Sequence, residues 1–217
     1  MNRYMKMIMS VGFALSAALA AQATPLTLGE TVQVQEVGFG PHETATITSS
    51  TLGTLTTGAG ILKLVVDGMA YNAICIDPYQ FSSSSAQSYT VADLATAPVP
   101  AMGAAAALTV EKLWADFYST ALVNPTVAAG LQLAIWETVA GSNFSVSGSD
   151  FGAAGMITSA NALSGTANLL ALASAKFQDY VVEVPPSVPD GGSTVLLLGL
   201  GLIVLALIAR RQRRAVA

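Results

Sequence analysis

The sequence has few of the side chains that most often carry chemistry. Its 217 residues include one cysteine, Cys75, and one histidine, His42, and only 10% of the residues are charged. A single cysteine excludes an intramolecular disulfide, and one cysteine with one histidine cannot supply the four ligands of an ordinary structural zinc site. Asp67 and Asp77 lack the spacing of a calcium-binding loop, so the sequence predicts no metal and no other cofactor.

Basic residues are scarce between the two ends of the chain. Lys63, Lys112 and Lys176 are the only ones outside the terminal segments, whereas all thirteen acidic residues lie between Glu30 and Asp190. These three lysines and thirteen acids give the central part a net charge of −10. Nucleic-acid binding needs clustered Lys and Arg side chains, so the composition excludes a nucleic acid as a partner.

The apolar run near the N-terminus is typical of a secretory signal peptide. Arg3 and Lys6 come before the run, and the small-x-small sequence of residues 21–23 follows it. We expect cleavage after Ala23, so that residues 1–23 are removed on export. The alternative is a buried N-terminal helix or an uncleaved anchor, for which the run is short.

A second apolar run, residues 195–209, ends at a cluster of arginines. The cluster consists of Arg210, Arg211, Arg213 and Arg214. Arginines that directly follow an apolar segment hold that end in the cytoplasm, so we expect residues 193–217 to form a transmembrane helix with a basic tail. The run is shorter than the roughly 20 residues of an ordinary spanning helix. A marginal anchor suits a segment that is later removed, and the alternative is a permanent single-pass anchor.

A short motif in the linker at 184–192 precedes this run. Its residues are Val188, Pro189, Asp190, Gly191 and Gly192. The order of motif, apolar helix and arginine cluster resembles the C-terminal sorting signals of the PEP-CTERM class, in their VPDSG-CTERM variant. The resemblance implies an exosortase as processing partner, which recognises the motif. It also implies a precursor held in the inner membrane by its C-terminal helix and then passed to the cell surface or the extracellular matrix.

The exported domain, residues 24–183, divides into two regions by pattern. Residues from about 30 to 80 are rich in Thr and Val in alternation, which is typical of antiparallel strands. Residues from about 103 to 180 have the pattern of helices. The expected fold class is therefore α+β, an antiparallel β part packed on a helical part, with the C-terminal transmembrane helix in addition.

The clearest hairpin signal surrounds Asp67-Gly68. This dipeptide joins two apolar runs and is a preferred centre of a type I′ turn, which fixes the register of the strands. Leu62 then faces Ala73 and Leu64 faces Tyr71, so Cys75 lies on the apolar face near the end of its strand. A free cysteine in that position is most often a small buried hydrophobic residue.

Two helices are expected further along the chain. An amphipathic pattern over residues 110–121 predicts the first, and Asn124-Pro125 supplies a cap and a first residue for a second helix that runs to about Ala140. Gln132 is the polar exception in the middle of that second helix, so we expect it to face inward. A buried carboxamide needs hydrogen-bond partners.

Two short motifs resemble the thioester domains of bacterial surface adhesins. They are Cys75-Ile76-Asp77 and the string Gln132-Leu133-Ala134-Ile135-Trp136. The resemblance implies an internal thioester between Cys75 and Gln132, with Ile76, Asp77, Ala134, Ile135 and Trp136 as motif neighbours. It also implies adhesion through an amine-bearing surface or matrix ligand, in a protein that reacts once and is not an enzyme. Two alternatives remain open: a structural matrix protein in which Cys75 and Gln132 merely pack, and a Cys–His hydrolase that uses His42.

Overall fold

The computed structural model describes residues 26–184 and Gly199. The described chain contains seven β-strands and three α-helices. The strands are β1 (Thr31–Ser49), β2 (Gly53–Val66), β3 (Met69–Cys75), β4 (Gln87–Ala92), β5 (Phe144–Ser147), β6 (Leu169–Ala173) and β7 (Tyr180–Glu183). The helices are α1 (Gly103–Ala121), α2 (Pro125–Ala140) and α3 (Ala153–Ala162), with short 3-10 turns at Leu94–Thr96 and Gly141–Asn143.

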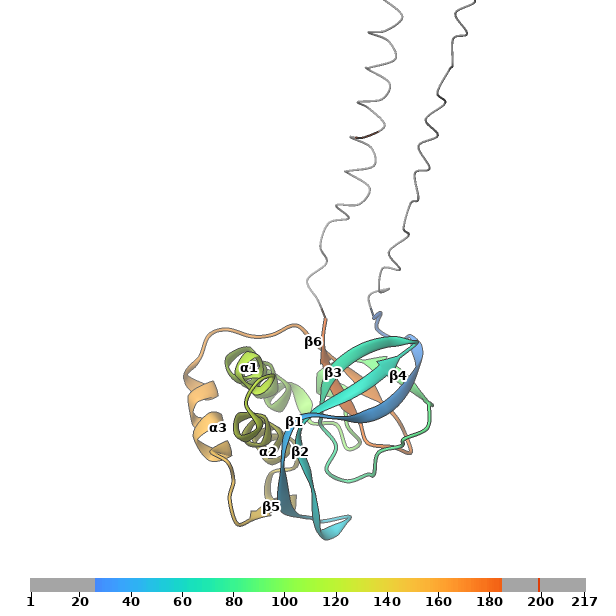
Figure 1. Cartoon of the computed structure of the whole chain (residues 1–217). Helices are drawn as coiled ribbons and strands as arrows, with labels where there is room; N and C mark the ends of the chain where they lie inside the picture. Colours follow the sequence, from blue (N-terminus) through green and yellow to red (C-terminus); the bar gives the residue numbers. More distant parts are fainter. Residues whose placement is uncertain (1–25, 185–198, 200–217) are drawn as a thin grey trace, which may run out of the picture.

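All seven strands belong to one antiparallel sheet. Its strand order is β2-β3-β7-β6-β4-β1-β5, and β1 also pairs with β2. This extra pairing brings six of the strands into a closed ring, while β5 extends the sheet along the far half of β1. The long β1 and β2 continue beyond the ring as an arm, and β5 pairs with β1 at its far end (Figure 1). Each of the six strands of the ring contributes buried residues to the apolar core.

The helices form a second layer against the arm side of the sheet. α2 packs against β1, β2 and β3, and α1 and α3 pack against α2 (Figure 1). α2 begins where expected: the Asn124 side chain accepts hydrogen bonds from the N–H groups of Thr126 and Val127, and Pro125 occupies the first turn. Every residue from Ala128 to Trp136 is buried, so α2 is the central helix of the domain.

The hairpin at Asp67-Gly68 has the predicted turn and register. Asp67 and Gly68 both have positive φ, 47° and 83°, as a type I′ turn requires. Leu62 pairs with Ala73 and Leu64 with Tyr71, as the sequence predicts. Cys75 is 1% exposed. The local chemistry of the turn therefore places the thiol inside the protein.

The expected fold class is wrong in its division of the chain. The described residues form a mostly antiparallel sheet with three helices, not a β part at 30–80 followed by a helical part at 103–180. The region expected to be helical contains β5, β6 and β7, and β4 lies outside the expected β part. β6 has the sequence Leu-Leu-Ala-Leu-Ala, a short apolar run whose alanines and leucines favour helix. It is a strand because it lies between β4 and β7 in the ring.

The expected transmembrane helix also lacks support. Residues 193–217 lie outside the described residues, apart from Gly199. Among the helices of the described chain, none has the length and apolar character needed to cross a membrane.

Candidate functional site

The site lies where β2 and β3 separate. The two strands pair as far as Leu62 and Ala73, and beyond that point β2 follows β1 into the arm. The register of β1 and β2 shifts between Phe39 and His42, opposite Gly60, whose φ is +149°. A side chain on Gly60 would collide with the main chain of β1, so this close crossing requires glycine. The divergence leaves the last residue of β3 without a strand partner on that side.

The carboxamide of Gln132 takes the place of the missing strand. Gln132 Nε2 donates a hydrogen bond of 2.7 Å to the carbonyl oxygen of Cys75, and the Cys75 N–H donates one of 3.1 Å to Gln132 Oε1. On the other side of the strand, the Ile76 N–H donates to the carbonyl oxygen of Asp179 at 3.0 Å. Gln132 is 1% exposed, so its amide and the main chain of Cys75 satisfy each other in the interior.

The sulfur of Cys75 has its own hydrogen bonds. The indole Nε1–H of Trp136 donates to Sγ at 3.3 Å, and so does the N–H of Asp77, while the thiol donates to the Asp77 carbonyl oxygen at 3.3 Å. Burial, followed by the negative charge of Asp77, raises the pKa of the Cys75 thiol well above its usual value. The thiol is therefore neutral at ordinary pH, although the indole donor favours the thiolate.

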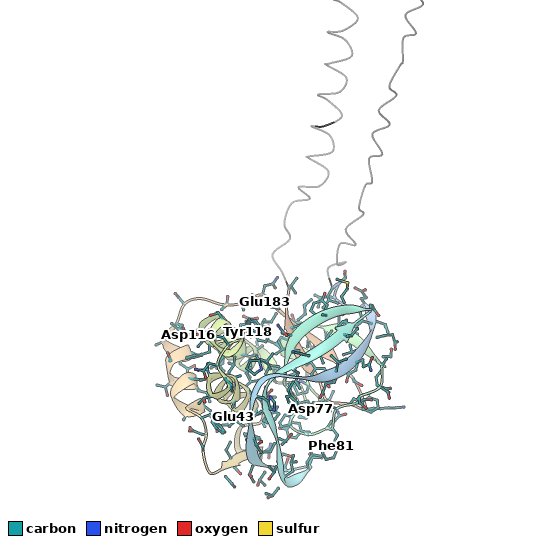
Figure 2. The ribbon with its side chains drawn as sticks, in the orientation of Figure 1. Glu43, Asp77, Phe81, Asp116, Tyr118 and Glu183 are labelled. Atoms are coloured by element: carbon teal, nitrogen blue, oxygen red, sulfur yellow. The ribbon has the colours of Figure 1, made fainter. Side chains whose placement is uncertain are left out.

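Two buried carboxyl groups lie beside the thiol. Asp77 and Asp179 are 0% and 1% exposed, and Figure 2 shows Asp77 near the centre of the molecule. Burial raises the pKa of Asp77 to about 6 and that of Asp179 to about 7, and Asp77 contributes to the rise at Asp179. Asp77 Oδ1 accepts from the Tyr79 N–H at 2.8 Å, and Asp77 Oδ2 is buried without a hydrogen-bond partner.

A small pocket connects the site to the surface. It has a volume of about 60 Å³, and its lining includes Cys75, Gln132 and Trp136. A neighbouring pocket of about 80 Å³ shares Trp136 with it and reaches Phe81, which is 66% exposed and lies toward the edge of the molecule in Figure 2. The pockets give a narrow approach to a thiol and an amide that are otherwise covered.

The structure brings together the residues of the two motifs. Ile76, Ala134 and Ile135 are 0% exposed and belong to the same buried core as Cys75. His42 is not among them: its ring stacks on Phe39 with 4.5 Å between centroids, and its Nδ1 bonds to the Gly40 carbonyl oxygen at 2.9 Å. The pocket at Cys75 is not lined by His42, so the geometry does not favour a Cys–His hydrolase.

Residues 187–213 match the VPDSG-CTERM motif. The match supports a PEP-CTERM-type sorting signal, which is typical of an exported, surface-directed protein that an exosortase processes. No curated protein and no solved structure matches the chain, so the thioester-domain resemblance has no support from these comparisons.

The predicted processing sites fall outside the described residues. They are the cleavage site at Ala23, the motif at 188–192 and the arginines at 210, 211, 213 and 214. The sorting signal at the C-terminus therefore rests on the sequence match, and cleavage at Ala23 stays a prediction.

Sequence reasoning missed two residues of the site. Glu36 lines the pocket from β1, and Gln178 lines it from the segment before β7. Glu36 follows Val32 and Val34 at a period of two, which places an acidic side chain on the buried face of its strand. An acidic residue in an apolar series was the one feature of the sequence that could have identified Glu36 as a site residue. Gln178 gives no such signal, because only the ring brings it near Cys75.

Proposed function

We propose that this exosortase-sorted protein carries a thioester-type adhesion or cross-linking domain. The observation that supports the proposal is the pairing of Cys75 and Gln132 at the end of β3, inside the protein and beneath a small pocket. On this proposal the mature protein acts at the cell surface or in the extracellular matrix, after a precursor stage at the membrane.

The proposed thioester forms when the sulfur of Cys75 replaces the amide nitrogen of Gln132. Sγ of Cys75 attacks Cδ of Gln132, the C–N bond breaks, and Nε2 leaves as ammonia after it takes up the thiol proton. A primary amine of a partner then attacks the same carbonyl carbon. That second step makes an amide to Gln132 and returns the proton to Sγ as a thiol, so atoms and charge balance.

Two hydrogen bonds favour this chemistry. The Cys75 N–H already donates to Gln132 Oε1, the atom on which negative charge develops when Sγ attacks Cδ. The Trp136 indole donates to Sγ and stabilises the charge that develops there. The buried surroundings exclude water, which would otherwise hydrolyse a thioester.

A second candidate is a sorted structural matrix protein without covalent chemistry. The hydrogen bonds of Gln132 favour this candidate, because both polar atoms of its carboxamide are bonded to the main chain of Cys75. A glutamine that completes the hydrogen bonding of a strand end has a sufficient structural role.

Intact mass distinguishes the two candidates. If the thioester forms, the purified protein is lighter than its processed sequence by one ammonia, resists alkylation when denatured, and gains methylamine with release of a free thiol. Cys75→Ala and Gln132→Ala should each abolish the methylamine adduct. A wild-type protein of full mass, with Cys75 alkylated as soon as the fold is opened, would leave only the structural candidate.

Sorting has a separate test. Replacing Pro189-Asp190 with Ala-Ala leaves the apolar run at 195–209 unchanged, and should spoil recognition by the exosortase. We expect full-length protein to accumulate in a strain that contains the cognate exosortase. Unchanged processing there would favour a permanent anchor.

A further inference from the structure

Glu36 is a carboxylate on the inward face of its strand. Val32 and Val34, at the preceding inward positions of β1, are 1% and 2% exposed, and Glu36 continues their alternation. The register of β1 shifts directly after Glu36, at a bulge before Gly38. Bulges of this kind change the direction of a side chain and are frequent beside functional sites.

The carboxylate of Glu36 has one hydrogen bond within the described protein. The Tyr180 hydroxyl donates to Glu36 Oε2 at 3.2 Å. Burial, Tyr89 and Glu36 all raise the pKa of Tyr180, so this hydroxyl stays a neutral donor. No lysine lines the pocket, and Glu36 is the only charged residue among those that do. The negative charge thus faces the pocket without a cationic partner there.

The pocket joins this charge to the proposed reaction centre. Its lining contains Glu36, Cys75 and Gln132 together, with Phe39 and Leu62 as apolar walls. Its volume of about 60 Å³ is room for roughly two water molecules, so only the end of a ligand can enter. An ammonium group on an unbranched apolar chain matches both the carboxylate and the walls.

We propose that Glu36 selects the ligand: its carboxylate binds the ammonium group of an unbranched primary amine and takes one of its protons before the amine attacks the Gln132 carbonyl. This inference rests on the proposed thioester. One proton passes from the ammonium nitrogen to Glu36 and from there to water. The free amine then attacks the Gln132 carbonyl carbon, and its second proton passes to Sγ as the C–S bond breaks, so the products are the amide, the thiol and one released proton. Amines that are already neutral gain nothing from Glu36.

The test uses two nucleophiles and two matched variants. n-Propylamine is a cation at neutral pH and methoxyamine is neutral, and the adduct of each is followed by intact mass. Glu36→Gln keeps a partner for Tyr180 but loses the charge, and Glu43→Gln removes another acid of β1 that does not line the pocket. We expect Glu36→Gln to slow the reaction with n-propylamine by about 10- to 100-fold and to leave methoxyamine within about two-fold.

Each outcome decides one question. If Glu36→Gln reacts with each nucleophile at the wild-type rate, the role of Glu36 is overturned while the thioester stands. The same holds if Glu43→Gln slows the reaction with n-propylamine as much as Glu36→Gln does. A wild-type protein of full mass would overturn the thioester and this inference with it. If Glu36→Gln does not form the thioester, the role of Glu36 is tested by the reaction rates of the wild-type protein alone. Its rate ratio of n-propylamine to methoxyamine should exceed that of a small thioester in solution by about ten-fold, and an equal ratio would contradict the proposal.

Discussion

The two ends of β3 are held in different ways. At Met69, the two-residue turn Asp67-Gly68 brings β2 alongside β3, and the main chain of Met69 pairs with the main chain of Val66. At Cys75, the main chain pairs with the side chain of Gln132, 57 residues later in the chain. The first end needs only local sequence, whereas the second exists only once α2 has docked on the sheet. The chemistry we propose is at the second end.

The largest expected effect comes from removing the side chain that completes the Cys75 end. Gln132→Ala leaves the N–H and carbonyl oxygen of Cys75 buried without partners and opens a cavity. Measured in a Cys75→Ala background, where no covalent bond can contribute, we expect a loss of about 4 kcal/mol in the free energy of unfolding. Chemical denaturation measures it.

A matched change at the other face of β3 serves as the control. Asn72 is exposed, pairs with Lys63 across the hairpin and has a side-chain hydrogen bond with Tyr118, so Asn72→Ala in the same background should cost about 1 kcal/mol or less. Equal losses for Asn72→Ala and Gln132→Ala would mean that the carboxamide is not the support of the Cys75 end.

The next effect is a dependence of stability on pH that arises beside Cys75. Asp77 and Asp179 have an ordinary pKa of 3.8, and in the folded protein burial raises these values to about 6 and about 7. The folded protein therefore binds protons more tightly than the unfolded chain between about pH 4 and pH 7. The contribution of these groups to stability is fully present below that window and is lost as the pH rises through it.

Isosteric variants show which carboxyl groups cause this dependence of stability on pH. Asp77→Asn and Asp179→Asn should each flatten the change in unfolding free energy between pH 4 and pH 7. Asp67→Asn, at the exposed Met69 end, should leave it in place. A wild-type protein whose stability rises across that window would show that other groups dominate and that the buried carboxyl groups do not control it.

The same contrast explains what the sequence could predict. The hairpin register and the start of α2 depend on turn and capping residues a few positions apart, so they were predicted correctly. β6 was missed because five apolar residues do not distinguish a strand from a buried helix. The pairing of Cys75 with Gln132 could be expected only from a resemblance, since no spacing rule brings a strand end and a helix middle together.

A smaller effect is expected from removing the hydrogen bond between the Trp136 indole and the Cys75 sulfur. Trp136→Phe keeps an aromatic ring near Phe144, whose centroid is 5.7 Å from that of Trp136, and removes the donor to Sγ. We expect a loss of about 1 kcal/mol in the free energy of unfolding and slower formation of the thioester. Thiol titration of freshly refolded protein follows the second quantity, and an unchanged rate would show that the indole bond is structural alone.

The smallest effect on Cys75 is expected from changes at the Met69 end, in the turn itself. Gly68 has a φ of +83°, and a Cβ added there would have no neighbour within 4 Å. Gly68→Ala therefore strains the backbone without a collision, and should cost about 1 kcal/mol in thermal or chemical unfolding. Gly68→Asn should cost less, because asparagine adopts positive φ more readily. The reactivity of Cys75 should not change in either variant, since its support comes from α2; altered alkylation of Cys75 in Gly68→Ala would show that the two ends of β3 are coupled.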